Sequence, residues 1–382
     1  MREKIAACRT WVVKIGSSLL TDAGLGNGTS LSPGPGLDRE AIAGWAAQIA
    51  RLREAGLKLV IVSSGAVAEG ANRLGLGAMP RELRLQAAAA AVGQMGVIEA
   101  WESCFSKHGV RTAQILLSHE DLSNRTRYLN ARSTLTSLLK LGAVPVINEN
   151  DSVATEELCL GDNDSLAALV SNLINADVMV NLTDQDGLFS ADPRKNEEAT
   201  LIGNARAGDP ALDRLAGTGG SLGRGGMITK LSAARLAARS GTHTIIANGR
   251  EPDLLPRLLE GAEIGTWLSA ENEPVTARKQ WLAGQLTLKG SLMLDAGAVR
   301  VLRSQGKSLL AVGITATEGS YRRGEVVACL DASGREIARG MVNYDSGEVA
   351  KLLGQDSSRI ADLLGYAGEE EIIHRDNLVL AC

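Results

Sequence analysis

A glycine-rich segment that ends in a lysine is the stretch of this sequence whose residue types point most directly to chemistry. Residues 223–230 read Gly-Arg-Gly-Gly-Met-Ile-Thr-Lys and lead into a helical pattern rich in Ala and Leu. Glycines let backbone N–H groups approach an anion, while a lysine and a helix N-terminus add positive charge. The spacing is not that of the common ATP loop G-x-x-x-x-G-K-[ST]. By itself the segment is therefore a candidate phosphate site, and an ordinary loop before a helix is the commoner meaning of such glycines.

A second lysine, Lys14, lies inside the apolar run from Trp11 to Ile15. Burying an ammonium group in such a run is costly unless it meets an anion. Lys14 and Lys230 together could neutralise charge on a phosphoryl group during transfer, a reaction that needs positioning and electrostatic stabilisation rather than a nucleophilic triad. The alternative for Lys14 alone is a lysine at a strand end that reaches solvent.

Carboxylates and amides gather in two short segments, Asn-Glu-Asn-Asp at residues 148–151 and Gly-Asp-Asn-Asp at residues 161–164. Carboxylates suit an α-ammonium group or Mg²⁺, and amides can serve both the amine and the carboxylate of an amino acid. The mixture favours a free amino acid as ligand. Asp162 or Asp164 could equally cap the helix that follows, and the two roles can coexist in neighbouring residues.

The elements that must position these residues follow a βα rhythm from residue 11 to about 267, which is typical of a parallel sheet. The expected strands are residues 11–15, 57–62, 111–116, 143–147, 178–182 and 242–247, and the expected helices include residues 38–54, 81–107, 133–141, 164–176 and 230–240. Polar or glycine-rich clusters follow four of these strands, and ligands of open parallel sheets bind beyond the carboxyl ends of the strands. We therefore predict an α/β fold, a three-layer αβα sandwich with a mainly parallel sheet and its site at that edge.

A chain of 382 residues favours two domains over one. We predict a first domain over residues 1–270, a linker over 271–283, and a small β-rich domain over 284–382, in which short strands precede a helix at 346–353. A Gly/Ser/Pro-rich insert at residues 22–36 is predicted to be a surface loop.

Composition excludes several classes of protein. The net charge of −4, with equal numbers of basic and acidic residues in residues 278–382, offers no broad basic field for nucleic acid. Five scattered cysteines without a C-x-x-C pair favour a reduced setting over a disulfide framework or a zinc site. No apolar stretch is long enough to cross a bilayer, and the N-terminus lacks the apolar region of a signal peptide. We expect a cytoplasmic protein with no membrane partner.

Taken together, these clusters resemble the glutamate 5-kinases of the amino acid kinase family. The matching segments are residues 12–18, 62–66, 129–132, 146–151, 161–164, 182–184, 191–194 and 225–230, in the same order and spacing along the chain. The tail is similar to a PUA domain, a β-rich module that binds RNA in other proteins, through residues 306–310, 323–327 and 340–344.

The resemblance implies a role for each matching residue. Lys14 and Lys230 would meet the ATP phosphates and the group in transfer, with Asp164 orienting both lysines. Glutamate would be held by Ser64, Gly65, Asp151 and Asn163. The nucleotide would contact Thr183, Asp184, Arg224, Gly225, Gly226, Met227, Ile228 and Thr229. Mg²⁺ would be carried by ATP, with no metal site on the protein. Arg224 and Ile228 depart from the small hydroxyl residues usual in the family, and the insert at 22–36 is longer than usual.

The activity implied by the resemblance is ATP-dependent phosphorylation of the γ-carboxylate of L-glutamate, the first step of proline biosynthesis, in a homodimer or homotetramer inhibited by proline. One alternative is another member of the family, such as an acetylglutamate kinase or an aspartokinase. Asp151 beside Asn163 favours a free α-amine and so argues against the acetylated substrate. The other alternative is an RNA-binding protein that acts through the PUA-like tail. The balanced charge of the tail argues against it, although Arg322 and Arg323 could form a small basic patch.

Overall fold

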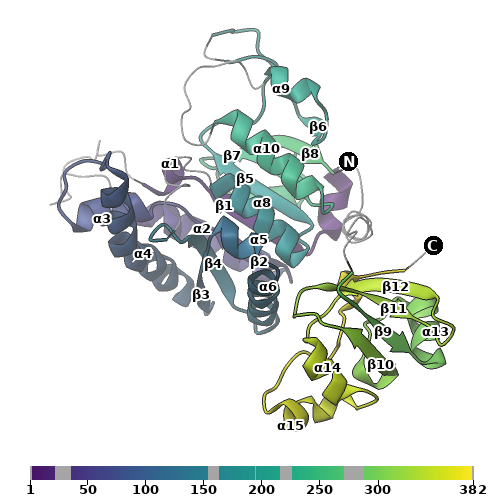
Figure 1. Cartoon of the computed structure of the whole chain (residues 1–382). Coiled ribbons are helices and arrows are strands. Elements are labelled where there is room, and N and C mark those ends of the chain that lie inside the picture. Colours follow the sequence, from purple (N-terminus) through teal and green to yellow (C-terminus); the bar gives the residue numbers. More distant parts are fainter. Residues whose placement is uncertain are drawn as a thin grey trace. The chain divides into compact units, whose positions relative to one another are not determined.

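An eight-stranded sheet forms the centre of the first part of the chain in the computed structural model of the protein (Figure 1). The structure describes residues 2–21, 36–153, 163–193, 195–215, 226–270 and 288–380. The strands of this sheet are β1 (Thr10–Ile15), β2 (Lys58–Val62), β3 (Thr112–Leu117), β4 (Val144–Glu149), β5 (Val178–Thr183), β6 (Asn204–Arg206), β7 (His243–Asn248) and β8 (Thr266–Ser269). Their order is β3-β4-β2-β1-β5-β7-β8-β6. The strands from β3 to β7 pair in parallel, β8 runs antiparallel to β7, and β6 is parallel to β8.

The prediction of a mainly parallel sheet is confirmed, and each of the six expected strands agrees with the structure to within two residues. The sequence patterns did not predict β6 and β8, which are only three and four residues long. Runs that short carry too little periodicity to stand out from loops.

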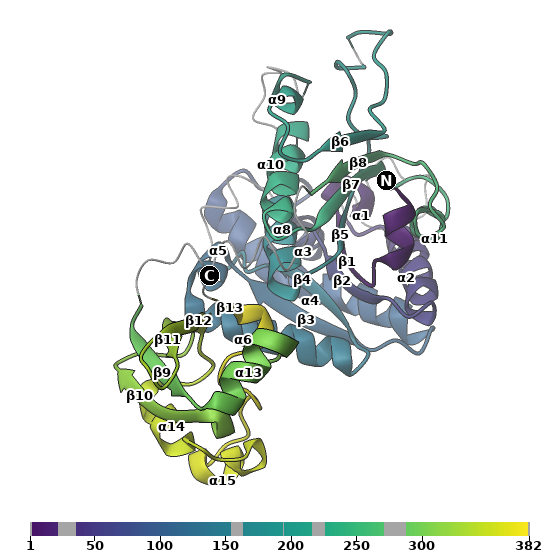
Figure 2. The ribbon, with the colours of Figure 1, turned by 90° about the vertical axis from the view of Figure 1, so that its right-hand side faces the viewer.

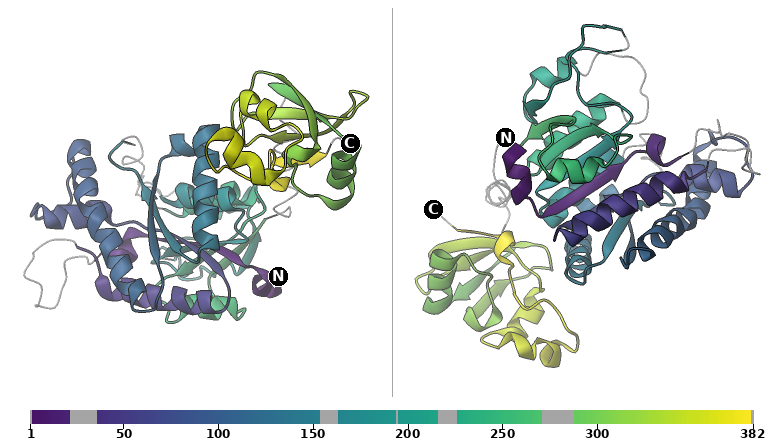
Figure 3. Two further views of the ribbon diagram at one scale, coloured as in Figure 1. Left: turned by 90° about the horizontal axis from the view of Figure 1, so that it is seen from below. Right: turned by 180° about the vertical axis from the view of Figure 1, so that it is seen from behind.

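Helices cover both faces of this sheet. They are α1 (Ser17–Leu20), α2 (Arg39–Glu54), α3 (Ala66–Arg73), α4 (Leu83–Ser106), α5 (His119–Ser123), α6 (Arg125–Lys140), α8 (Asn163–Ile174), α9 (Ala211–Leu215), α10 (Met227–Ala238) and α11 (Leu254–Leu259). Figure 2 shows α8 and α10 on one side of the sheet and α2 and α11 on the other. The view from behind in Figure 3 accordingly places α2 in front of the strands. The three-layer αβα arrangement is thus present.

The alternation of side chains along each strand decides which residues meet which helices. Trp11 and Val13 of β1 join Trp45 of α2 and Trp101 of α4 in one buried core. On the opposite face, Ile246 of β7 packs with side chains of α10 in a smaller core. Residues of β1 and β5 that point away from the α2/α4 core therefore face α8.

Two helices begin earlier than expected. The helix predicted from residue 133 is α6, which begins at Arg125 because Asn124 caps it: Asn124 Oδ1 accepts from the backbone N–H of Arg127 at 3.1 Å. The helix predicted from Lys230 is α10, which begins at Met227 after an N-cap at Gly226. Lys230 therefore lies within the first helical turn or just after it, next to the helix N-terminus.

The chain divides into two compact units, one of Met1–Leu122 with Ala131–Glu273 and the other of Ser123–Asn130 with Pro274–Cys382. A second sheet in the order β10-β9-β11-β12-β13 belongs to the latter unit. Its strands are β9 (Gly290–Leu294), β10 (Ile314–Gly319), β11 (Val326–Leu330), β12 (Glu336–Met341) and β13 (Leu378–Leu380), and the unit also contains helices α13 (Ala296–Gln305), α14 (Ser346–Leu352) and α15 (Ile360–Leu364). The helix expected at 346–353 is α14, whereas α13 lies where only strands and turns were expected.

The predicted linker at 271–283 lies outside the described residues, as does the insert except for Gly36. Among the residues that the structure describes, no helix has the length and apolar character needed to cross a membrane.

Candidate active site

Lys14 lies on the central strand β1, between β2 and β5, and the fold turns its side chain towards α8. Its neighbours Val13 and Ile15 point into the core shared with α2 and α4, so Lys14 points to the other face. In the register with β5, Lys14 is paired with Asn181, whose side chain faces the same way. Strands β1 and β5 thus place a buried ammonium group and a buried amide next to the N-terminus of α8.

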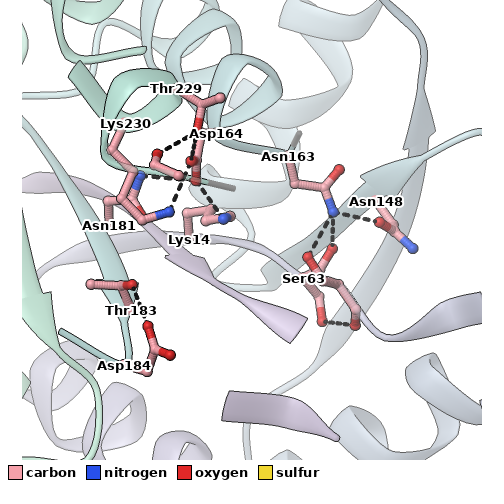
Figure 4. A network of polar contacts seen from close by, with 12 residues as sticks. Lys14, Ser63, Asn148, Asn163, Asp164, Asn181, Thr183, Asp184, Thr229 and Lys230 are labelled. Carbon is pink, nitrogen blue, oxygen red and sulfur yellow. Dashed lines mark hydrogen bonds and ion pairs between the residues drawn. The ribbon is translucent and has the colours of Figure 1, made fainter. Parts of the chain in front are cut away.

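Asp164, in the first turn of α8, joins the two lysines (Figure 4). Its Oδ1 pairs with Lys14 Nζ and accepts from Asn181 Nδ2 at 2.9 Å. Its Oδ2 lies 3.0 Å from Lys230 Nζ and accepts from Thr229 Oγ1 at 3.1 Å. The structure therefore brings together three residues that the sequence separates by as many as 216 positions.

This group is almost sealed from water: the exposed fractions of the side chains are 7% for Lys14, 6% for Lys230 and 0% for Asp164. Burial opposes the charged form of Asp164, but the ammonium groups of Lys14 and Lys230 outweigh it and hold the pKa of the carboxyl below its ordinary value. Asp164 thus holds two ammonium groups close together, an arrangement that suits the binding of an anion such as a phosphoryl group.

The N-terminus of α10 lies at the same place because Lys230 and Thr229 belong to its first turns. The first N–H groups of an α-helix have no acceptor within the helix, and the helix dipole makes this end positive. Thr229 Oγ1 also lies 2.7 Å from the carbonyl oxygen of Gly226, so its one hydroxyl hydrogen is shared between this oxygen and Asp164 Oδ2. The side chain of Ile228 is exposed, and that of Met227 packs against the core beneath α10. Arg224 and Gly225 lie outside the described residues.

A second polar group surrounds Asn163, the residue before Asp164. Its Nδ2 lies 2.9 Å from the carbonyl oxygen of Ser63, 2.9 Å from Ser64 Oγ and 3.1 Å from Asn148 Oδ1, and its two hydrogens are shared among these three acceptors. Since Nδ2 faces these three acceptors, the carbonyl oxygen Oδ1 of Asn163 points away from them (Figure 4). Asn163 therefore presents an acceptor, and Ser64 retains its hydroxyl hydrogen for another partner.

Gly65 follows Ser64 and forms the N-cap of α3 with φ = +101°. A side chain at this backbone angle would be strained, and a Cβ would lie 3.0 Å from Leu37. Glycine thus permits the tight turn after β2 that presents Ser64. Asp151 lies two residues beyond the end of β4, partly exposed in a turn.

Thr183 and Asp184 form a third group at the end of β5. Thr183 Oγ1 donates to Asp184 Oδ1 at 3.2 Å, with Thr183 buried and Asp184 exposed. Figure 4 shows this pair apart from the lysines and Asp164.

Two site residues were not singled out from the sequence. Asn181 had a detectable signal, because it is a polar residue within the apolar strand Val-Met-Val-Asn-Leu-Thr. Asn148 was included in a polar cluster without a role, and its contact with Asn163 depends on the meeting of β4 and α8. Within the described residues, no group of three or more His, Cys, Asp or Glu side chains is arranged to hold a metal ion.

Comparisons with known proteins agree with this geometry. Residues 9–248 match the amino acid kinase family, and residues 290–364 match the PUA domain. The chain is 58% identical over 381 residues to proteins named glutamate 5-kinase from Pseudomonas putida and from Pseudomonas entomophila, with 100% of each chain covered. The structure of a UMP kinase from Bacillus anthracis matches with a TM-score of 0.46 and 15% identity over 69% of this chain and 97% of that one, a likeness too distant to carry the assignment. Since the family match spans residues 9–248, more than half of the sequence, the chain belongs to the amino acid kinase family.

Proposed function

We propose that this protein transfers the γ-phosphoryl group of ATP to the γ-carboxylate of L-glutamate, forming L-glutamyl 5-phosphate, the first step of proline biosynthesis. The observation that carries the proposal is the buried group of Lys14, Asp164 and Lys230 at the carboxyl end of the sheet. The full-length match to proteins named glutamate 5-kinase supports the choice of substrate.

In this proposal the two lysines stabilise the phosphoryl group while it moves between oxygen atoms. Charge on the transferring group is shared among its oxygens, so fixed ammonium groups in a dry site lower the barrier without forming a covalent bond. Asp164 contacts both lysines and is their positioning residue. Attack comes from the γ-carboxylate oxygen of glutamate, and ADP leaves with the electron pair of the broken P–O bond.

ATP would bind at the N-terminus of α10, where the backbone N–H groups of Met227 and Ile228 begin the helix and Thr229 lies beside Asp164. Thr183 and Asp184 would contact the nucleotide from the end of β5, and Gly226, together with Arg224 and Gly225, would belong to the loop around the phosphates. The two ammonium groups of Lys14 and Lys230 suit an anionic nucleotide. Mg²⁺, carried by ATP, would neutralise part of the phosphate charge.

Glutamate would bind at the group around Asn163. The free Oδ1 of Asn163 suits an α-ammonium donor, and the hydroxyl of Ser64 suits a carboxylate acceptor. Asp151 would add negative charge for the ammonium group, and the turn at Gly65 would bring backbone N–H groups close to the substrate.

These preferences argue against the two alternatives. An acetylated amine has one N–H and no charge, so it would form fewer hydrogen bonds with Asn163 and no ion pair with Asp151. RNA binding through the second unit would favour a broad basic field, but residues 278–382 hold equal numbers of basic and acidic residues. The contacts of Asn163 thus favour an amino acid over its acetylated form, and the balanced charge argues against RNA.

A hydroxylamine trap tests the proposal, because an acyl phosphate reacts with hydroxylamine to give a hydroxamate, which forms a coloured complex with ferric ion. Purified protein with ATP and Mg²⁺ should form hydroxamate from glutamate, and much less from N-acetylglutamate or aspartate. A preference for either competitor, or no ATP-dependent product from glutamate, would contradict the proposed substrate.

Further properties are inferred from the sequence patterns, the composition and the family resemblance. We infer domains over residues 1–270 and 284–382 with a linker at 271–283, a cytoplasmic homodimer or homotetramer, and inhibition by proline. Light scattering of the purified protein would measure the oligomer, and the hydroxamate assay with added proline would measure the inhibition.

A further inference from the structure

Helix α4 makes two polar contacts with the residues around Asn163, one with Asn148 on β4 and one with Ser63 just after β2. Gln94 Oε1 accepts from Asn148 Nδ2 at 2.7 Å, and Trp101 Nε1 donates to Ser63 Oγ at 3.1 Å. Gln94 and Trp101 are seven residues apart, so they share one face of the helix. Both are buried, with exposed fractions of 8% and 0%. Neither residue belongs to the group of Lys14, Asp164 and Lys230 or to the pair of Thr183 and Asp184.

A series of hydrogen bonds runs from Ser63 through Asn163 and Asn148 to Gln94. The carbonyl oxygen of Ser63 determines which atom donates and which accepts in each of them. The carbonyl oxygen of Ser63 can only accept, so Asn163 must turn Nδ2 towards it. The Oδ1 of Asn148 accepts from the same Nδ2, which leaves Nδ2 of Asn148 as the atom that faces α4. That atom can only donate, and Gln94 meets it with an acceptor.

Only the oxygen end of the Gln94 amide is hydrogen-bonded. The contact with Asn148 is the only hydrogen bond of the Gln94 side chain within the described part of the chain, and its Nε2 is buried there without a partner. Leaving a buried donor unpaired costs free energy. The position of this side chain is therefore better explained by what Oε1 does for Asn148 than by the stability of the amide itself.

We propose that Gln94 is a positioning residue for glutamate binding: through Asn148 it keeps the amide of Asn163 oriented with Oδ1 towards the substrate ammonium group. This inference rests on the proposed function. Without an acceptor at position 94, Nδ2 of Asn148 loses its hydrogen bond to α4, and the orientation of the Asn148 amide is less strongly fixed. If Asn148 turns over, its Nδ2 faces Nδ2 of Asn163, and two donors repel. Asn163 is then held only by its bonds to the carbonyl oxygen of Ser63 and to Ser64 Oγ, so its Oδ1 is less firmly directed towards the substrate ammonium group.

The test compares three variants of the full chain in the hydroxamate assay. Gln94→Met keeps the length of the side chain and removes the acceptor, so KM for glutamate should rise about tenfold, the usual consequence of losing one buried hydrogen bond, while KM for ATP stays within about twofold. Gln94→Glu retains an acceptor oxygen and should keep KM for glutamate within about threefold of the wild type. Gln86→Met is the matched control, because Gln86 is buried on the same helix and its Nε2 donates to the carbonyl oxygen of Pro80. It should lower thermal stability without changing KM for glutamate.

Each result decides the inference. An unchanged KM for glutamate in Gln94→Met, or equal rises in the KM values for glutamate and ATP, would overturn it. A tenfold rise in Gln94→Glu would also overturn it, even if Gln94→Met fails to fold. Hydroxamate formation by the wild type separates the two proposals. If the wild type makes no product from glutamate, the proposed function fails, whereas a wild type that works and an indifferent Gln94→Met refute only the role of Gln94.

Discussion

Replacing Asp164 with Asn should destabilise the protein by an amount that the structure allows to be estimated. The carboxylate is fully buried and contacts two ammonium groups that are themselves 7% and 6% exposed. Removing one partner of a buried ion pair costs about 3–5 kcal/mol, because a charge is left without compensation. Asn keeps one acceptor oxygen, so we expect the lower end, about 3 kcal/mol. At about 2–4 °C per kcal/mol for a domain of this size, the melting temperature should fall by about 6–12 °C.

The effect of Asp164→Asn on the melting temperature should also change with pH, in a direction that follows from the pKa of Asp164. The pKa of Asp164 is lower in the folded protein than in the unfolded chain, so its stabilising contribution is complete above the unfolded value of about 3.9 and is lost as the pH falls towards the folded value. The difference in melting temperature between wild type and Asp164→Asn should be constant from about pH 7 to pH 5 and should shrink below about pH 4.

Scanning calorimetry of the full-length proteins measures both quantities. Asp253→Asn is the control, because Asp253 forms an exposed ion pair with Arg51, and such surface pairs contribute about 0–1 kcal/mol. Melting of Asp164→Asn within about 2 °C of the wild type would refute the reasoning about the buried group. So would a difference that stays the same between pH 7 and pH 3.

Other substitutions and modifications test separate parts of the account. Lys14→Ala and Lys230→Ala should each lower kcat at least about a hundredfold at saturating substrates in the hydroxamate assay, and a value within threefold of wild type would remove that lysine from catalysis. Gly93→Ala should destabilise the protein by about 1–3 kcal/mol in urea unfolding, because its Cβ would lie 1.9 Å from a backbone oxygen of α3, whereas Gly44→Ala, with nothing within 4 Å, should stabilise α2 slightly. Burial, reinforced by a nearby carboxylate, raises the pKa of the Cys329 thiol to about 12, so iodoacetamide at pH 8 should label Cys329 only after unfolding. Mass spectrometry of the peptides checks this, and rapid labelling of the folded protein would contradict it.

The position of the site could be predicted because it follows from a regular feature of the fold. Parallel strands end at one edge, so a lysine within the first strand and the polar clusters after later strands had to converge there. Lys14, Asp164 and Lys230 meet in the structure as that argument requires. The same regularity explains why the boundaries of the six longer strands agree so well.

The hydrogen bonds behind the site could not be predicted in this way. Gln94 lies in an Ala-rich helical stretch, and its bond to Asn148 joins residues 54 positions apart. Such a contact depends on how α4 packs on β4, which no local pattern encodes. Helix α13 was missed although a signal was present: Asp295 caps it by accepting from the backbone N–H of Ala298, and Gly306 ends it in the left-handed conformation.

An isotope experiment tests the central claim most directly, namely that a carboxylate oxygen of glutamate attacks the phosphorus atom of ATP. Glutamate labelled with ¹⁸O in its γ-carboxylate is incubated with the protein, ATP and Mg²⁺. The acyl phosphate that forms cyclises as the α-amine attacks the γ-carbonyl carbon, and the phosphate released keeps the bridging oxygen. The account predicts inorganic phosphate that contains one ¹⁸O atom, detected by ³¹P NMR, and only when glutamate is present. Unlabelled phosphate at the same rate of ATP consumption would mean that water, rather than glutamate, is the acceptor.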